Sequence, residues 1–132
     1  MNRLALVLRV LAPVFFIVAA LHIFLGLQAD RLLGANVPPS AAADPSLDSQ
    51  NRFYGAALTL YGLVLLLCAA DLRRNAAFFK AALAAFFLGG LARLVSWAAH
   101  GPPAPLVIAL AVSELVLPPV LWLWYRSVQN AA

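Results

Sequence analysis

Four long apolar runs limit the fold of this chain more than any other feature of its sequence. They cover about residues 4–27, 49–70, 76–99 and 105–125. A helix needs about 20 mostly apolar residues to cross the hydrocarbon core of a bilayer, and each run is long enough. The pattern predicts an all-α membrane protein, in which residues 1–132 form a single bundle of four transmembrane helices.

The composition supports a membrane environment. Hydrophobic residues make up 64% of the 132 residues and charged residues only 11%. Water-soluble domains average about 45–50% apolar and about 25% charged residues. A soluble fold of this size has too little interior to bury the surplus. We therefore expect apolar side chains to face lipid around the bundle.

The first apolar run has a competing interpretation as a signal peptide, because Arg3 and Arg9 accompany it. Its apolar part is longer than the roughly 7–15 residues of a signal h-region. The sequence Leu27-Gln28-Ala29 is also a poor cleavage site. These features favour a retained first helix.

A polar segment over about residues 28–48 separates the first two runs and is expected to form an outer loop. Pro38, Pro39 and Pro45 prevent one continuous helix there, because proline lacks the backbone N–H donor. We expect Ser46 or Asp48 to cap the second transmembrane helix, since their side-chain oxygens can accept free backbone N–H groups.

Small residues at helical spacing indicate where the helices pack. Gly55 and Gly62 share a narrow face of the second predicted helix, and such faces let membrane helices approach closely. Ala85 and Gly89 belong to a stripe in the third helix that repeats every four residues and reaches Arg93. The stripe predicts that Arg93 points into the bundle.

The distribution of basic residues predicts the orientation. With four spans, both termini and the start of the third helix lie on the same side of the membrane. That side has six basic residues: Arg3, Arg9, Arg73, Arg74, Lys80 and Arg126. The opposite side has Arg31 and Arg52 together with three aspartates. The positive-inside rule therefore places both termini in the cytoplasm and the 28–48 loop outside.

Two opposite charges stand inside apolar runs on either side of a tight turn at residues 100–103. At 1.5 Å per residue, Arg93 lies roughly 9 Å and Glu114 roughly 13–14 Å from the outer ends of their helices. The two side chains can therefore meet. His22 and Arg52 belong to the same outer half, and Ser96, one turn past Arg93, is expected to bond within the bundle.

This polar constellation has two interpretations, which remain open at this stage. A charge inside the membrane costs about 2.5 kcal/mol or more, so such residues pair with one another or face a wet cavity. Arg93 and Glu114 either form a structural ion pair between two helices or line an outward pocket, in which His22 joins them around a ligand headgroup. Arg52 is expected to contact lipid headgroups or to pair with Asp48, four residues earlier.

Sequence motifs of soluble chemistry are missing. Cys68 is the only cysteine, which excludes a multi-cysteine metal site, and no second histidine stands at ligand spacing from His22. There is no H-E-x-x-H, no phosphate-binding glycine loop and no G-x-S-x-G. The net charge of +4 is dispersed and forms no basic stripe for nucleic acid. We expect no metal, no cofactor and no nucleic-acid partner.

Three strings carry a resemblance to a known family: LDSQNRFYGAAL, GGLARLVSWAAHGPP and SELVLPPVLWLW. They resemble a bacterial family of small four-helix inner-membrane proteins that is catalogued as a domain of unknown function. The matching positions are Asp48, Arg52, Phe53, Gly55, Gly90, Arg93, Gly101, Pro103, Glu114 and Pro118. More loosely, the chain looks like DoxX-type four-helix membrane proteins. The resemblance implies the bundle and the bacterial inner membrane, and no established activity.

We therefore expect a non-enzymatic role, either binding a lipid or small amphiphile or serving as an accessory subunit of a membrane complex. One alternative is a small isomerase-like enzyme acting on a lipid. In it, Glu114 would be the acid/base, Arg93 its electrostatic partner and His22 a second proton carrier. The other alternative is a transporter component, which would have to form a homo-oligomer.

Overall fold

The computed structural model describes residues 2–130, and every regular element in that range is helical. The six helices are α1 (Asn2–Leu25), α2 (Gln28–Leu32), α3 (Pro39–Ala42), α4 (Pro45–Ala70), α5 (Ala76–His100) and α6 (Pro105–Asn130). Four of them, α1, α4, α5 and α6, are long and apolar enough to cross a membrane. The prediction of an all-helical fold with four helices able to cross a membrane is confirmed.

The surface of the long helices suits lipid better than water. Large apolar side chains are exposed on all four, including Ile17 of α1, Leu60 of α4, Leu88 of α5 and Leu123 of α6. Water would penalise this much exposed apolar surface, and a bilayer would not. The burial pattern therefore supports the membrane environment that the composition predicted.

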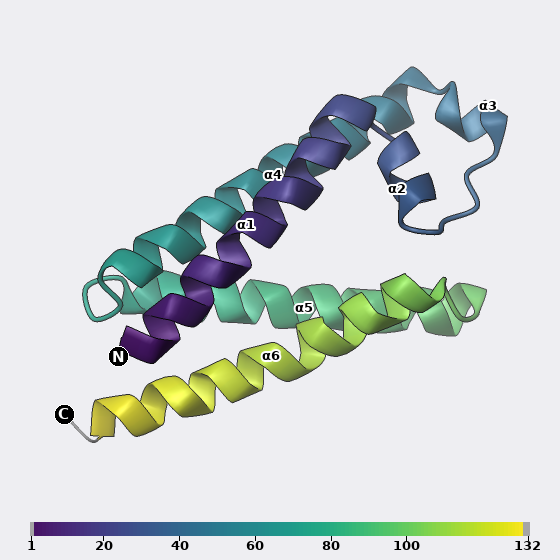
Figure 1. The fold of residues 1–132 in the computed structure, drawn as a ribbon. Coiled ribbons are helices and arrows are strands. Elements are labelled where there is room, and N and C mark those ends of the chain that lie inside the picture. Colours follow the sequence, from purple (N-terminus) through teal and green to yellow (C-terminus); the bar gives the residue numbers. More distant parts are fainter. Residues whose placement is uncertain (1, 131–132) are drawn as a thin grey trace.

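The long helices are arranged as two antiparallel pairs (Figure 1). α1 packs along α4, α5 packs along α6, and far fewer residues join one pair to the other. The pairs lie close where α4 turns into α5 and separate toward the end that carries α2 and α3. The start of α1 and the end of α6 lie at the close end.

The hydrophobic core fills the close end of the molecule. Its fully buried side chains come from all four long helices: Leu4 and Leu8 of α1, Cys68 of α4, Phe79 of α5 and Tyr125 of α6. The Phe79 and Tyr125 rings lie 5.2 Å apart, centroid to centroid. A hydrogen bond of 2.7 Å from the Tyr61 hydroxyl to the Ala82 carbonyl also ties α4 to α5.

Capping determines where α4 begins, four residues before the predicted start at residue 49. The Asp44 carboxylate accepts hydrogen bonds from the backbone N–H groups of Ser46 and Leu47, at 2.8 and 3.1 Å. Pro45 occupies the first turn, where its missing N–H costs nothing. The prediction that Ser46 or Asp48 caps this helix is therefore wrong.

Other boundaries also differ from the predicted ones. α1 ends at Leu25, because Gly26 adopts a positive φ of 56° that breaks the helix. α6 continues to Asn130, past its cluster of aromatic residues. The segment over residues 28–48 is not simply a loop, since it contains α2 and α3.

Close helix approach occurs at Gly55 and Gly62, as their spacing predicted. A Cβ atom on Gly55 would lie 2.8 Å from the Ala19 carbonyl oxygen, and one on Gly62 would lie 2.8 Å from the Phe16 ring. Both contacts are tighter than real Cβ atoms show, so these glycines bring α4 against α1.

In α5 the close approach occurs at Gly90 and not on the predicted Ala85–Gly89 stripe. A Cβ atom on Gly90 would lie 2.8 Å from Leu115 of α6, whereas one on Gly89 would make an ordinary contact with Glu114. Ala85 is exposed. With 3.6 residues per turn, positions four apart shift around the helix by about 40° each step, so Ala85 lies away from α6 although Gly89 and Arg93 face it.

Candidate functional site

Arg93 of α5 and Glu114 of α6 form an ion pair in the half of the second helix pair that is nearer the turn between α5 and α6. The Arg93 Nε atom donates to Glu114 Oε2 at 2.7 Å. The Arg93 side chain is 30% exposed and that of Glu114 is 11% exposed. Gly90 lets α6 come close one turn before Arg93, which allows the carboxylate to reach the guanidinium.

The pair lines a cavity that we call the inter-pair cavity, because all four long helices contribute to its wall. Its volume is about 290 Å³, near the lower end for ligand pockets. Four lining residues bring polar groups, namely Tyr54, Arg93, Ser113 and Glu114. The rest of the wall is leucine, valine and phenylalanine, so the cavity is apolar except at this polar group.

The polar group lies midway along the cavity and divides it into two sections. On α6 the wall runs from Leu106 to Leu121, about 22 Å at 1.5 Å per residue. The section from Glu114 toward Leu121 is wholly apolar and ends near core residue Leu8. The other section reaches Leu33, which follows α2, at the end where the helix pairs separate.

The free donors of Arg93 matter for what the cavity can bind. A guanidinium has five N–H donors, and Glu114 takes the one on Nε. The Ser113 hydroxyl donates to the Leu110 carbonyl at 2.7 Å, so its oxygen remains an acceptor. The cavity therefore offers N–H donors, a carboxylate acceptor and a hydroxyl acceptor close together.

His22 lies beside the cavity and not in its wall. Its side chain is nearly fully buried, and Nδ1 lies 2.8 Å from the Val18 carbonyl, which makes Nδ1 the protonated nitrogen. Nε2 faces the Asp30 carboxylate of α2 at 3.6 Å. The imidazole meets the Tyr54 ring edge to face, with centroids 5.2 Å apart. His22 thus packs against the Tyr54 ring without lining the cavity itself.

Two further polar contacts hold the ends of α1, α2 and α4 together. Asn51 donates to Asp30, and its Oδ1 is buried without a hydrogen-bond partner among the described residues. Arg52 binds the Asp48 carboxylate at 2.7 Å and also donates to the Ile23 carbonyl at the end of α1, at 2.6 Å. These contacts fix α2 beside Tyr54.

The predicted site residues therefore fall into three places. Arg93 and Glu114 meet in the cavity, while His22 and Arg52 belong to the neighbouring contacts of α1, α2 and α4. Ser96 is exposed and forms no side-chain hydrogen bond within residues 2–130. Three residues past Arg93, the side chain is displaced by about 60° around the helix axis, and Ser96 lies outside the cavity wall.

Sequence reasoning missed Tyr54, Ser113 and Asp30. Tyr54 and Ser113 stand in apolar helical sequence without a pattern that points to the cavity. Asp30 reaches His22 because the chain reverses after Gly26. The one sequence signal for that reversal is a single glycine at the end of an apolar run.

In the described part of the chain, no cluster of three or more histidine, cysteine or acidic residues could hold a metal ion. The fold and site together define a multi-pass helical membrane protein with a largely apolar cavity that contains a buried ion pair.

The chain belongs to a family described as a domain of unknown function, DUF4345, whose model matches residues 3–125. The predicted resemblance to a family of unknown function is thereby confirmed. No curated protein and no solved structure matches the chain. The looser likeness to DoxX-type proteins receives no support from these comparisons.

Proposed function

We propose that this protein binds a membrane amphiphile in the inter-pair cavity, with the polar group of the ligand at Arg93 and Glu114. The observation that carries the proposal is an apolar cavity of about 290 Å³ with one cluster of polar side chains in its wall. That volume equals about ten water-sized volumes, which suits a chain or small ring system better than a whole phospholipid.

The chemistry of the cavity favours a ligand with a neutral polar group. Glu114 already balances the charge of Arg93, so the Glu114 carboxylate would repel an anionic ligand. A hydroxyl or an amide can accept from Arg93 and donate to Glu114 or Ser113 without adding net charge, and a carbonyl can accept from Arg93. The apolar part of the ligand then occupies the section toward Leu121.

The enzymatic alternative receives less support from the geometry. It needs His22 as a second proton carrier beside Glu114, but His22 does not line the cavity and its Nε2 faces Asp30. No contact within residues 2–130 supports a role as a transporter component or as an accessory subunit. Binding of an amphiphile uses Arg93, Ser113 and Glu114, which all line the cavity.

The experiment is to fill the cavity and follow the bound ligand. In Leu58→Trp the larger side chain enters the cavity one turn from Tyr54, so we expect the purified variant to lose the small amphiphile that accompanies the unaltered protein. Native mass spectrometry, followed by extraction and identification of the ligand, measures the loss.

Leu60→Trp is the matched control, because Leu60 is on the same helix and exposed. It should retain the ligand as the unaltered protein does. Equal retention by both variants, with both folded, would show that no ligand occupies the cavity and would overturn the proposal.

We also propose a bacterial inner-membrane location with both termini in the cytoplasm. The structure supports a shared side, because α1 begins and α6 ends at the same end of the molecule (Figure 1). Arg73 and Arg74, in the turn between α4 and α5, lie at that end too. The excess of basic residues at this end of the molecule favours its placement on the cytoplasmic side of the membrane.

A further inference from the structure

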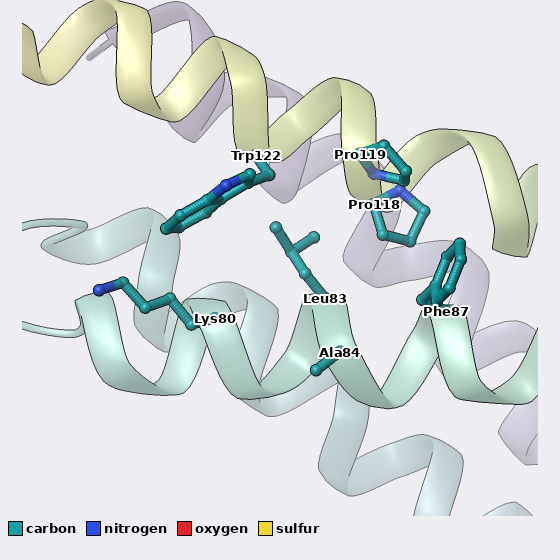
Figure 2. A pocket seen from close by; sticks show the side chains of 7 residues that line it. All are labelled: Lys80, Leu83, Ala84, Phe87, Pro118, Pro119 and Trp122. Atoms are coloured by element: carbon teal, nitrogen blue, oxygen red, sulfur yellow. The ribbon is translucent and has the colours of Figure 1, made fainter.

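A second hollow lies on the outside of the α5/α6 pair, near the end where α4 turns into α5. We call it the α5/α6 groove; its volume is about 470 Å³. Figure 2 shows its lining: Lys80, Leu83, Ala84 and Phe87 from α5, with Pro118, Pro119 and Trp122 from α6. It has no lining residue in common with the inter-pair cavity.

Residue size accounts for the groove. Ala84 and the compact rings of Pro118 and Pro119 leave space between the helices, while Phe87 and Trp122 stand at its two ends (Figure 2). From Lys80 to Phe87 the groove follows α5 for about 10 Å at 1.5 Å per residue. Its wall is apolar apart from Lys80.

Lys80 gives the groove a charge that no carboxylate of the described residues balances. Its ammonium lies 5.5 Å from the centroid of the Trp122 ring, a cation–π contact, and it forms no ion pair within residues 2–130. Arg126, one turn beyond Trp122 on α6, is exposed. A cation beside apolar surface in a membrane favours an anionic partner.

We propose that the α5/α6 groove binds an anionic phospholipid, with the lipid phosphate at Lys80 and part of one acyl chain along Ala84 and Phe87. The apolar groove matches the chain, and the unbalanced ammonium matches the phosphate. Trp122 lies in the last third of α6, and indole rings prefer the boundary between headgroups and acyl chains. The proposal is independent of the inter-pair cavity and of which leaflet holds this end.

A second copy of the chain is the competing occupant, and the charges disfavour it. Two copies side by side in one orientation would bring their basic ends together, where Lys80 and Arg126 of each would repel the other. An anionic lipid in the groove would neutralise the positive charge of Lys80, whereas a second copy would add more positive charge beside it.

The test uses the full-length protein and two lipids with the same acyl chains, phosphatidylglycerol and phosphatidylcholine, titrated and followed by native mass spectrometry. Phosphatidylglycerol should bind more tightly. Lys80→Gln should weaken its binding about fivefold, which is the contribution expected of one basic residue near an anionic lipid. Lys80→Arg should restore the preference, since it restores the charge.

Arg9→Gln is the charge-matched control, because Arg9 is exposed at the same end of the molecule but on α1. It should change phosphatidylglycerol binding less than twofold. If Lys80→Gln and Arg9→Gln weaken binding equally, or if the two lipids bind equally to the unaltered protein, the proposed site does not exist.

A second pair of variants tests the groove itself. Ala84→Phe fills it and should reduce binding of both lipids, whereas Ala85→Phe, at an exposed neighbouring position, should not. If Ala84→Phe instead converts a dimer to a monomer and leaves lipid binding unchanged, a second copy covers the groove and the proposal is wrong.

Discussion

Arg93 and Glu114 are mutually dependent, because each would otherwise hold a charge among apolar helices. Their Nε–Oε2 distance of 2.7 Å and the low exposure of Glu114 indicate a strong electrostatic contact. Such a pair need not add net stability relative to apolar residues of equal volume, but losing one partner leaves the other uncompensated. The same pair can therefore hold α5 against α6 and present donors to a ligand.

Glu114→Gln should reduce the free energy of unfolding by about 2–3 kcal/mol. This is below the 3–5 kcal/mol typical of a fully buried pair, because the Arg93 side chain is 30% exposed and keeps some contact with polar surroundings. Thermal unfolding of the detergent-solubilised variant, followed by its tryptophan fluorescence, measures the change.

Asp48→Asn provides the control, since it weakens an ion pair with Arg52 at the same 2.7 Å distance but in a more exposed place. We expect a much smaller loss of stability than for Glu114→Gln, because water screens an exposed pair. If both variants lose equal stability, the Arg93–Glu114 pair is no more buried in the membrane than a surface pair.

At the scale of single residues, the sequence predicted the meeting of Arg93 and Glu114 well. A short turn and two helical depths were sufficient, because they limit where the side chains can be. The positions of His22 and Ser96 relative to the cavity could not be predicted in this way. They depend on the rotation of each helix about its axis, which is set by packing partners that one sequence does not reveal.

Among the elements, α1 and α4 make the closest contact, and small residues in α4 make it possible. The backbone carbonyl of Ala19 occupies the space that a side chain at Gly55 would need. A carbonyl in a helix cannot move aside as a flexible side chain can, so a larger residue must push the helices apart.

Gly55→Leu should therefore destabilise the α1/α4 pair, by about 1–3 kcal/mol as for other overpacked interiors. Ala57→Leu, at an exposed position of the same helix, should leave stability within about 0.5 kcal/mol. Melting temperatures of both variants in one detergent make the comparison. Equal melting temperatures would mean that α1 and α4 are not in close contact at Gly55.

The existence of the four long helices was predictable from the apolar runs, whereas their ends were less so. α4 starts early because Asp44 caps it and Pro45 fits its first turn, both of which hydropathy ignores. α6 continues to Asn130 because polar residues extend a helix as readily as apolar ones where no proline or glycine stops it.

For the whole molecule, the grouping of the helices into two pairs was beyond sequence reasoning. Adjacent apolar runs can pair in several ways, and a short turn alone requires only that α5 and α6 be neighbours. The pairing of α1 with α4 follows from the fit of Gly55 and Gly62 against α1. Neither the inter-pair cavity nor the α5/α6 groove could be predicted before this arrangement was known.

The proposed orientation predicts the outcome of reporter fusions. Green fluorescent protein attached to the C-terminus should fluoresce and alkaline phosphatase there should be inactive, because both termini are proposed to be cytoplasmic. Phosphatase inserted between α2 and α3, within residues 34–37, should be active. An active phosphatase at the C-terminus would reverse the proposed topology.

The hydrophobic core joins the four long helices at one end of the molecule only. We therefore expect the protein to be stiffer at this end than at the end where the helix pairs separate. A small rotation of one helix pair about the core widens the space beside Leu33 and Leu106 while hardly disturbing Phe79 and Tyr125. On this expectation, lateral pressure at the separated end would change the width of the cavity section beside Leu33.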